Sequence, residues 1–240
     1  MKKAILFYFP YAGASSVSFK NIDAFFSEDV EVVCIEYAGH GKRIEEKFAD
    51  SVIALANEAF AEILQRQDKA PIFLAGHCLG ALVAYEVCHL MKNANIKELA
   101  GLIISGQGSP DDIISEHLQN MDEDKLLDYL VVHELMDSAL LSQRFRGYVT
   151  ELILKPIIND SVVYDFYVNN NNEALHIPVT ILYGMDDARY PLVKLKRWEG
   201  FVEKAITFYP FSGGHYFIRK NEKNYFEKIN DVINDAINEV

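Results

Sequence analysis

The chain has 240 residues, of which 50% are hydrophobic, so it can bury one full core, and a single domain is the simplest expectation. It carries 23 basic and 35 acidic residues, for a net charge of -12, which argues against nucleic-acid and anionic-membrane partners because both require a basic surface. The three cysteines, Cys34, Cys78 and Cys88, are an odd number without metal-ligand spacing and favour a reducing compartment.

The apolar runs are too short for a membrane span, which needs about 20 residues. The first of them, residues 4–9, ends at Pro10 before it reaches the length of a signal-peptide core. We therefore expect a cytoplasmic protein that binds neither membrane nor nucleic acid. The sequence gives no sign of a metal site or of a cofactor.

Strand-type and helix-type stretches alternate along most of the chain. Short β-branched and aromatic runs predict strands at residues 4–9, 30–37, 72–75, 99–105, 179–183 and 205–208. Helical periodicity covers residues 19–26, 50–67, the run after residue 78, 192–200 and 224–237. This alternation is typical of an α/β fold with a mostly parallel sheet flanked by helices on both faces.

One long segment interrupts the alternation. Residues 110–172 contain charged amphipathic stretches at 122–132, 137–154 and 156–168, then an Asn169–Asn172 linker. A helical insertion between two strands of a parallel sheet lies near the carboxyl ends of the strands, where such proteins bind ligands. We therefore predict one domain, residues 1–240, with a helical lid insertion at about 108–172. The alternative is a helical subdomain that only adds core.

The most informative motif lies where the third strand meets the next helix. Gly76-His77-Cys78-Leu79-Gly80 has the pattern of a nucleophile elbow, G-x-S-x-G, with a thiol in place of the hydroxyl. Glycines on both sides suit a turn that leaves no room for Cβ atoms and exposes the central residue at the top of the sheet. We interpret Cys78 as the nucleophile; the alternative is a thiol that only packs in the core.

A nucleophile needs a base, and the base needs a residue that orients it. In proteins with this elbow the chain order is nucleophile, acid, histidine, with the last two on loops after late strands. Cys78, Asp187 and His215 follow that order, and Gly213-Gly214 lets the backbone bring His215 close. Asp187 is the preferred acid from its distance to the preceding strand, and Asp186 is the alternative.

Two backbone N–H groups complete the predicted site. We expect the oxyanion to be held by Leu79, at the start of the elbow helix, and by Ala12 in the loop after the first strand, with Tyr11 as the alternative. His77 is interpreted as a packing or hydrogen-bonding residue. The remaining histidines have no supporting context in the sequence: His40, His89, His117, His133 and His176.

Five segments resemble motifs of the type II thioesterases of nonribosomal peptide and polyketide synthesis. They are Phe9–Ser16 (F-P-x-A-G-G-[SA]), Tyr37–Arg43 (P-G-R-G-x-R), Gly76–Ala81 with Ala84–Glu86 (G-H-S-M-G-A and A-[FY]-E), Leu154–Asp160 with Tyr164 (L-P-x-L-R-A-D), and Phe211–Phe217 (F-x-G-G-H-F-F). Cys78 departs from the serine usual in that family.

The resemblance implies an α/β-hydrolase fold and cleavage of acyl or peptidyl thioesters from the phosphopantetheine arm of a carrier protein. An acyl or peptidyl carrier protein would then be the partner of a monomeric enzyme that passes through an acyl-enzyme on Cys78. Two alternatives stay open: a small-molecule esterase or acyltransferase on the same fold, and a non-catalytic module that binds carrier proteins.

Overall fold

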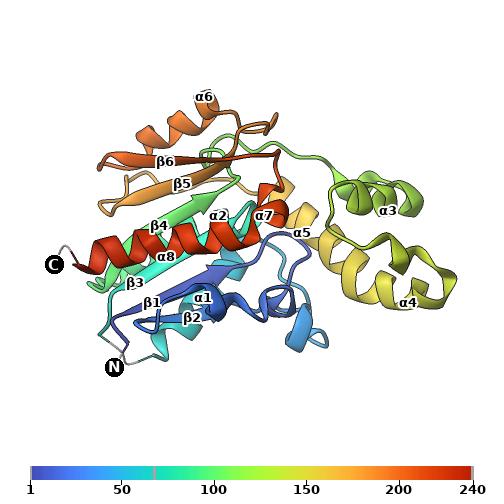
Figure 1. Ribbon diagram of the computed structural model, residues 1–240, viewed down its shortest axis with the longest axis horizontal. Helices are drawn as coiled ribbons and strands as arrows, with labels where there is room; N and C mark the ends of the chain where they lie inside the picture. Colours follow the sequence, from blue (N-terminus) through green and yellow to red (C-terminus); the bar gives the residue numbers. More distant parts are fainter. Residues whose placement is uncertain (1, 67–68, 239–240) are drawn as a thin grey trace.

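The computed structural model describes residues 2–66 and 69–238, and a six-stranded parallel sheet runs through it (Figure 1). The strand order is β2-β1-β3-β4-β5-β6, and every neighbouring pair is parallel. The strands are β1 (Ala4–Phe9), β2 (Val30–Cys34), β3 (Ile72–His77), β4 (Leu99–Ser105), β5 (Val179–Gly184) and β6 (Ile206–Phe211). The predicted fold class is confirmed, although β2 is shorter and β6 longer than expected.

Helices cover both faces of this sheet. In β1 all six side chains are buried, which explains why its sequence is continuously apolar instead of alternating. The Tyr8 ring lies 5.3 Å from Phe226 of α8 (Glu222–Asn238), whereas the guanidinium of Arg66, just after α1 (Val52–Leu64), lies over the ring of Phe7. Because successive strand residues point to opposite faces, α8 and α1 lie on opposite sides of the sheet. Figure 1 shows α8 crossing the near face.

The remaining helices outside the lid are α2 (Leu79–Asn93), α6 (Leu192–Leu195) and α7 (Phe217–Lys220), and the sequence did not predict α7. The helix expected at residues 19–26 is wrong: two 3₁₀ turns, Ser16–Phe19 and Ile22–Phe25, replace it. Between them, Asn21 leaves the helical conformation, with φ -115° and ψ 17°. Asparagine favours such breaks because its side chain can compete for backbone hydrogen bonds. Helix α1 begins where Ser51 Oγ accepts the N–H of Ala54, and residue 67, its expected end, lies outside the described residues.

The insertion between β4 and β5, which we call the lid insertion, is helical. It contains α3 (Glu123–Val132), α4 (Arg146–Val149), a π turn at Thr150–Leu154 and α5 (Lys155–Asp165); two 3₁₀ turns replace the first part of the helix expected at 137–154. A second hydrophobic cluster holds these elements together: Leu118, Leu126, Leu127, Leu130, Met136, Val149, Leu154 and Ile157.

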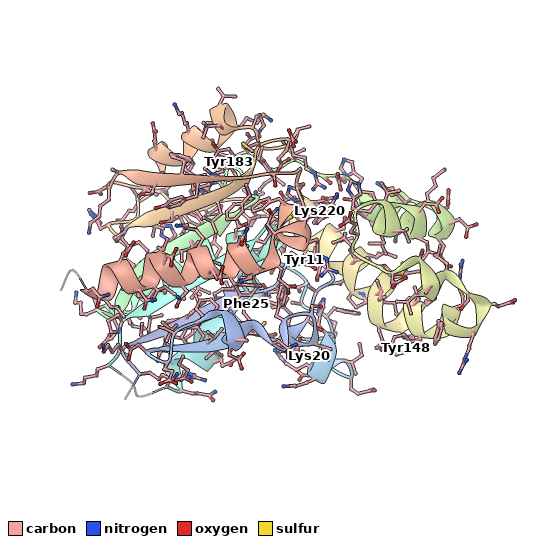
Figure 2. All side chains as sticks on the ribbon, viewed as in Figure 1. Tyr11, Lys20, Phe25, Tyr148, Tyr183 and Lys220 are labelled. Carbon is pink, nitrogen blue, oxygen red and sulfur yellow. The ribbon has the colours of Figure 1, made fainter. Side chains whose placement is uncertain are left out.

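The lid insertion projects beyond the carboxyl ends of the strands (Figure 1). Figure 2 places Tyr11, in the loop after β1, where the sheet meets the lid, and Tyr148 on the outer part of the lid, where its side chain is exposed. The lid therefore stands over the edge of the sheet that carries the elbow. Within the described ranges, none of the helices combines the length and apolarity that crossing a membrane requires.

Candidate active site

Cys78 occupies the sharp turn between β3 and α2. Its backbone has φ 52° and ψ -118°, an uncommon conformation for a residue with a side chain, and such strain is concentrated at functional sites. A Cβ on Gly76 would lie 2.3 Å from the carbonyl oxygen of Gly80, and one on Gly80 would lie 2.1 Å from the carbonyl oxygen of Phe9. Both flanking glycines are therefore required by the packing of the turn.

The loops after β5 and β6 bring an aspartate and a histidine together beside this turn. Nδ1 of His215 lies 3.0 Å from Oδ2 of Asp187, and both side chains are buried. Asp187 Oδ1 accepts the backbone N–H of Arg189 at 2.9 Å, which fixes the orientation of the carboxylate. Asp186 is exposed, so Asp187 is the aspartate that contacts His215.

This contact determines which nitrogen of His215 can react. A carboxylate only accepts, so Nδ1 carries a proton and Nε2 is left to take one. Nε2 is buried and has no hydrogen-bond partner among the described residues. Burial lowers the pKa of His215, but the contacts with Asp187 and Cys78 together outweigh it, so the net pKa is raised above its ordinary value. His215 is thus a buried base that faces the thiol.

His77 lies directly behind this base. Its ring centroid is 5.3 Å from that of His215, and its Nδ1 lies 2.8 Å from Oγ of Ser105. Burial, followed by the positive charge of a protonated His215, holds the pKa of His77 well below its ordinary value. His77 is therefore an uncharged hydrogen-bonding residue, as its position beside the nucleophile predicted.

The loop after β1 turns sharply beside Cys78. The N–H of Ala14 donates to the carbonyl of Tyr11 at 2.9 Å, and Gly13 has φ 76°, as the third residue of such a turn requires. Neither the N–H of Ala12 nor that of Leu79 donates to another described residue. Ala12 also lines the cavity next to Cys78, so the geometry favours it over Tyr11 as a donor.

A cavity of about 30 Å³ adjoins the Cys78 thiol, which is 7% exposed. The core lines this cavity with Ala12, Arg189 and Tyr216, and the lid lines it with residues that include Glu116 and Tyr164. The hydroxyl of Tyr164 donates to Oε1 of Gln107 at 2.9 Å, so this part of the lid is hydrogen-bonded to the loop that follows β4.

Arg189 and Glu116 separate this small cavity from a larger one of about 350 Å³ on the outer side of His215. Nη2 of Arg189 lies 2.7 Å from Oε1 of Glu116 and 3.0 Å from the hydroxyl of Tyr129, both on the lid. The sequence did not single out these residues, because they follow no motif and meet only in the fold.

The structure shows a partner for His40, a residue without supporting context in the sequence. It is buried, and its Nε2 lies 3.0 Å from Oδ2 of Asp160 on α5, 120 positions along the chain. Both residues lie in segments that resemble thioesterase motifs, Tyr37–Arg43 and Leu154–Asp160. Nothing in the sequence shows that the two side chains form a pair.

The other two cysteines are unsuited to nucleophilic chemistry. Burial raises the pKa of Cys34 to about 12, and burial also raises that of Cys88, so neither forms appreciable thiolate near neutral pH. Within residues 2–66 and 69–238, no three side chains of His, Cys, Asp or Glu gather as a metal site would require. The chemistry that this edge of the sheet supports is therefore nucleophilic attack by Cys78 assisted by His215.

Comparison with known proteins identifies the family. The thioesterase domain family matches residues 4–235. Thioesterase PikA5 of Streptomyces venezuelae is 25% identical over 234 residues, covering 93% of this chain and 77% of PikA5. Gramicidin S biosynthesis protein GrsT of Aneurinibacillus migulanus is 24% identical over 232 residues, covering 94% of this chain and 87% of GrsT.

Solved structures share the fold of this chain. YbtT, described as a type II thioesterase from the yersiniabactin NRPS/PKS biosynthetic pathway, superposes with a TM-score of 0.83 at 23% identity, covering 98% of this chain and 95% of YbtT. The match of nearly the whole chain to the family agrees with the arrangement of a nucleophile elbow beside a histidine and an aspartate. The chain belongs to the thioesterase domain family, whose members are enzymes that hydrolyse thioester bonds.

Proposed function

We propose that the protein is a type II thioesterase that hydrolyses acyl or peptidyl thioesters from the phosphopantetheine arm of a carrier protein in nonribosomal peptide or polyketide synthesis. The observation that carries the proposal is the hydrogen bond of 3.0 Å from His215 to Asp187, beside a thiol on a strained elbow. The pathway is supported by relatives whose names place them in gramicidin S and yersiniabactin biosynthesis.

In the first half of the reaction, Cys78 is acylated. His215 Nε2 takes the proton of the thiol, and the sulfur attacks the carbonyl carbon of the substrate. The N–H groups of Ala12 and Leu79 stabilise the tetrahedral oxyanion. Collapse breaks the bond to the carrier thiol, which leaves with the proton from His215. One thioester replaces another, so this step is close to thermoneutral.

In the second half, water removes the acyl group. His215 Nε2 takes a proton from the water as its oxygen attacks the acyl carbon of the Cys78 thioester. The same two N–H groups hold the second oxyanion, and its collapse releases the acid and the thiol of Cys78. Asp187 stays ionised throughout and stabilises the imidazolium that forms twice in each cycle.

The cavity beside Cys78 adds a requirement. An acyl group attached to a pantetheine arm is larger than this cavity of about 30 Å³, so the part of the lid around Glu116 has to move before acylation while α5 stays against the core. The cavity of about 350 Å³ beyond Arg189 is the adjoining open volume. Movement of the lid would join the two cavities, because Glu116 in their shared wall belongs to the lid.

The proposal is tested with a carrier protein that bears a radiolabelled acyl group on its phosphopantetheine. Cys78→Ala should lower the rate of acyl release by about a thousandfold or more, and His215→Ala should do comparable damage. Cys88→Ala is the matched control, since it removes a buried thiol from α2 without touching the site, and it should retain activity. Undiminished release by Cys78→Ala would refute the assignment.

Comparing loaded carrier protein with free acyl thioesters and esters tests the partner separately. We expect a higher kcat/KM with the carrier, since only the carrier presents a protein surface to the lid. Equal kcat/KM values would instead support an esterase or acyltransferase acting on small molecules. A stable carrier complex without turnover, and without acylation of Cys78, would support the non-catalytic module.

A further inference from the structure

Asp160 lies on the lid helix α5 but makes its contacts with the core. The carboxylate is 1% exposed, and its Oδ2 accepts the backbone N–H of Gly13 at 2.8 Å and faces Nε2 of His40 at 3.0 Å. The other ring nitrogen of His40, Nδ1, lies 3.0 Å from the carbonyl of Ala38. Since a carbonyl and an ionised carboxylate both only accept, both bonds form together only when His40 carries two protons.

The hydrogen bond to Gly13 falls inside the turn that presents Ala12. The Tyr11 carbonyl is engaged by Ala14, and because the peptide is planar and trans, the N–H of Ala12 points the opposite way. Asp160 holds the next peptide, through the N–H of Gly13. Two consecutive peptide planes are therefore fixed, and with them the direction of the Ala12 N–H.

Helix α5 also presses on the turn through an apolar contact. A Cβ on Gly13 would lie 2.8 Å from Cβ of Ile157, one turn before Asp160 on the same helix. The turn can approach α5 this closely only because residue 13 is glycine. The carboxylate of Asp160 and the side chain of Ile157 thus both contact Gly13 in the loop after β1.

Fold stability alone does not explain why the carboxylate of Asp160 is buried. Its second oxygen, Oδ1, is buried without a hydrogen-bond partner among the described residues, which is unfavourable for a charged group. Unsatisfied buried groups of this kind call for a functional explanation. The nearest functional element is the Ala12 N–H, one residue from the Gly13 N–H that Asp160 binds.

We propose that Asp160, held by His40, is a positioning residue of the oxyanion site. It aims the Ala12 N–H at the oxygen that becomes negative when Cys78 attacks. The inference rests on the proposed function, because it requires Ala12 to be an oxyanion donor. It adds that the oxyanion site is complete only while α5 lies against the core, so that the position of the lid controls chemistry as well as access.

The first test compares three variants on loaded carrier protein. Asp160→Ala should lower kcat by about tenfold to a hundredfold with little change in KM, because the lost contact acts in the transition state. Asp160→Asn keeps an oxygen that can accept from Gly13 and should recover most of the lost kcat. Asn159→Ala is the matched control: it removes the neighbouring hydrogen bond from α5 to the carbonyl of Ala49, which does not involve the turn, and should leave kcat unchanged.

The second test separates positioning from a general structural role. A trifluoromethyl ketone analogue of the acyl-pantetheine adds to Cys78 and forms an oxyanion, whereas the corresponding thioether analogue binds without forming one. Asp160→Ala should lower the affinity for the ketone by about tenfold or more and leave the affinity for the thioether unchanged. Equal weakening of both analogues, or an unchanged kcat in the folded variant, would overturn the inference.

Two further outcomes are distinguishable from these. If Asp160→Ala does not fold, Asp160→Ser replaces it, because its shorter side chain stays polar but cannot reach Gly13, and the same split between the two analogues is expected. If Cys78→Ala turns over at the wild-type rate, the proposed function itself is wrong. Normal loss of activity in Cys78→Ala, together with a wild-type kcat in a folded Asp160 variant, rejects only the positioning role.

Discussion

Two imidazoles lie side by side in the site, and their surroundings shift their pKa values in opposite directions. His77 is held uncharged by burial and by the neighbouring His215, while Asp187 and Cys78 raise the pKa of His215 against the effect of burial. The ring centroids are only 5.3 Å apart, so two positive charges would repel strongly. Any proton that enters the pair therefore resides on His215, the ring that faces the thiol.

A prediction about pH follows for the step that removes the acyl group. That step needs uncharged His215, so deacylation should accelerate as pH rises through the pKa of this imidazole, which Asp187 raises against the lowering effect of burial. Asp187→Asn removes a charge that raises the pKa of His215. The acidic limb of the pH–rate profile for deacylation should therefore move to lower pH, while the maximal rate falls steeply.

The measurement is the single-turnover rate of deacylation of pre-acylated enzyme between about pH 5 and 9. The isolated acyl-enzyme is used because Cys78 is then already a thioester and does not titrate. A limb that stays in place in Asp187→Asn would contradict the assignment of Asp187 as the group that tunes His215.

At the scale of elements, the site depends on how closely α2 approaches β1. The first turn of α2 touches the backbone that follows β1, where a Cβ on Gly80 would lie 2.1 Å from the carbonyl oxygen of Phe9. This contact brings the start of α2, which carries the N–H of Leu79, close to the loop that contains Ala12. In the proposed mechanism, the start of α2 would also direct its partial positive charge at the oxyanion.

Gly80→Ala should therefore damage both stability and activity. The added methyl group meets backbone atoms on a buried strand end, so we expect a loss of roughly 3 kcal/mol or more in the free energy of unfolding. The matched control is Gly147→Ala in α4, where a Cβ meets nothing within 4 Å and should stabilise the protein by about 0.5 kcal/mol. Denaturant titration of both variants checks the prediction, and similar midpoints would contradict it.

At the scale of the molecule, the chain has two hydrophobic clusters of unequal size. The larger one includes both faces of the sheet, and the smaller one, centred on Leu126 and Leu130, lies within the lid. On the α3 side, the lid contacts the core through partly exposed polar groups such as Arg189 and Glu116. On the α5 side the contacts are buried, as for Asp160 and Tyr164. The α3 side therefore has the weaker attachment.

This asymmetry predicts local unfolding of the lid. In native-state hydrogen exchange, amides of α3 and α4 should open at lower free energy than those of β3 and α2. Leu130→Ala creates a cavity in the smaller cluster, at a cost of about 3 kcal/mol, and should accelerate exchange in α3 and α4 by about a hundredfold. Exchange in β3 should stay unchanged; equal acceleration throughout would show that the two clusters unfold as one.

The parts of the site that short motifs encode could be predicted from the sequence. A turn too tight for Cβ atoms demands Gly76 and Gly80, and the order of Cys78, Asp187 and His215 follows from the positions of the strands. The pairing of His40 with Asp160 could not be predicted, because it joins groups 120 positions apart and depends on how the lid lies on the core. The turns at Ser16–Phe25 were missed for a local reason, because apolar spacing alone does not register the break at Asn21.

The small volume beside Cys78 has a consequence for a cell full of activated acyl compounds. A permanently open thiol with a nearby base would consume free thioesters wastefully, whereas here Cys78 is only 7% exposed and adjoins a cavity of about 30 Å³. Every substrate therefore binds with an apparent affinity reduced by the fraction of molecules in which the lid has moved. Under the proposed function, a carrier protein that also binds the lid would raise that fraction through contacts a free thioester lacks, so the position of the lid would act as a filter against futile hydrolysis.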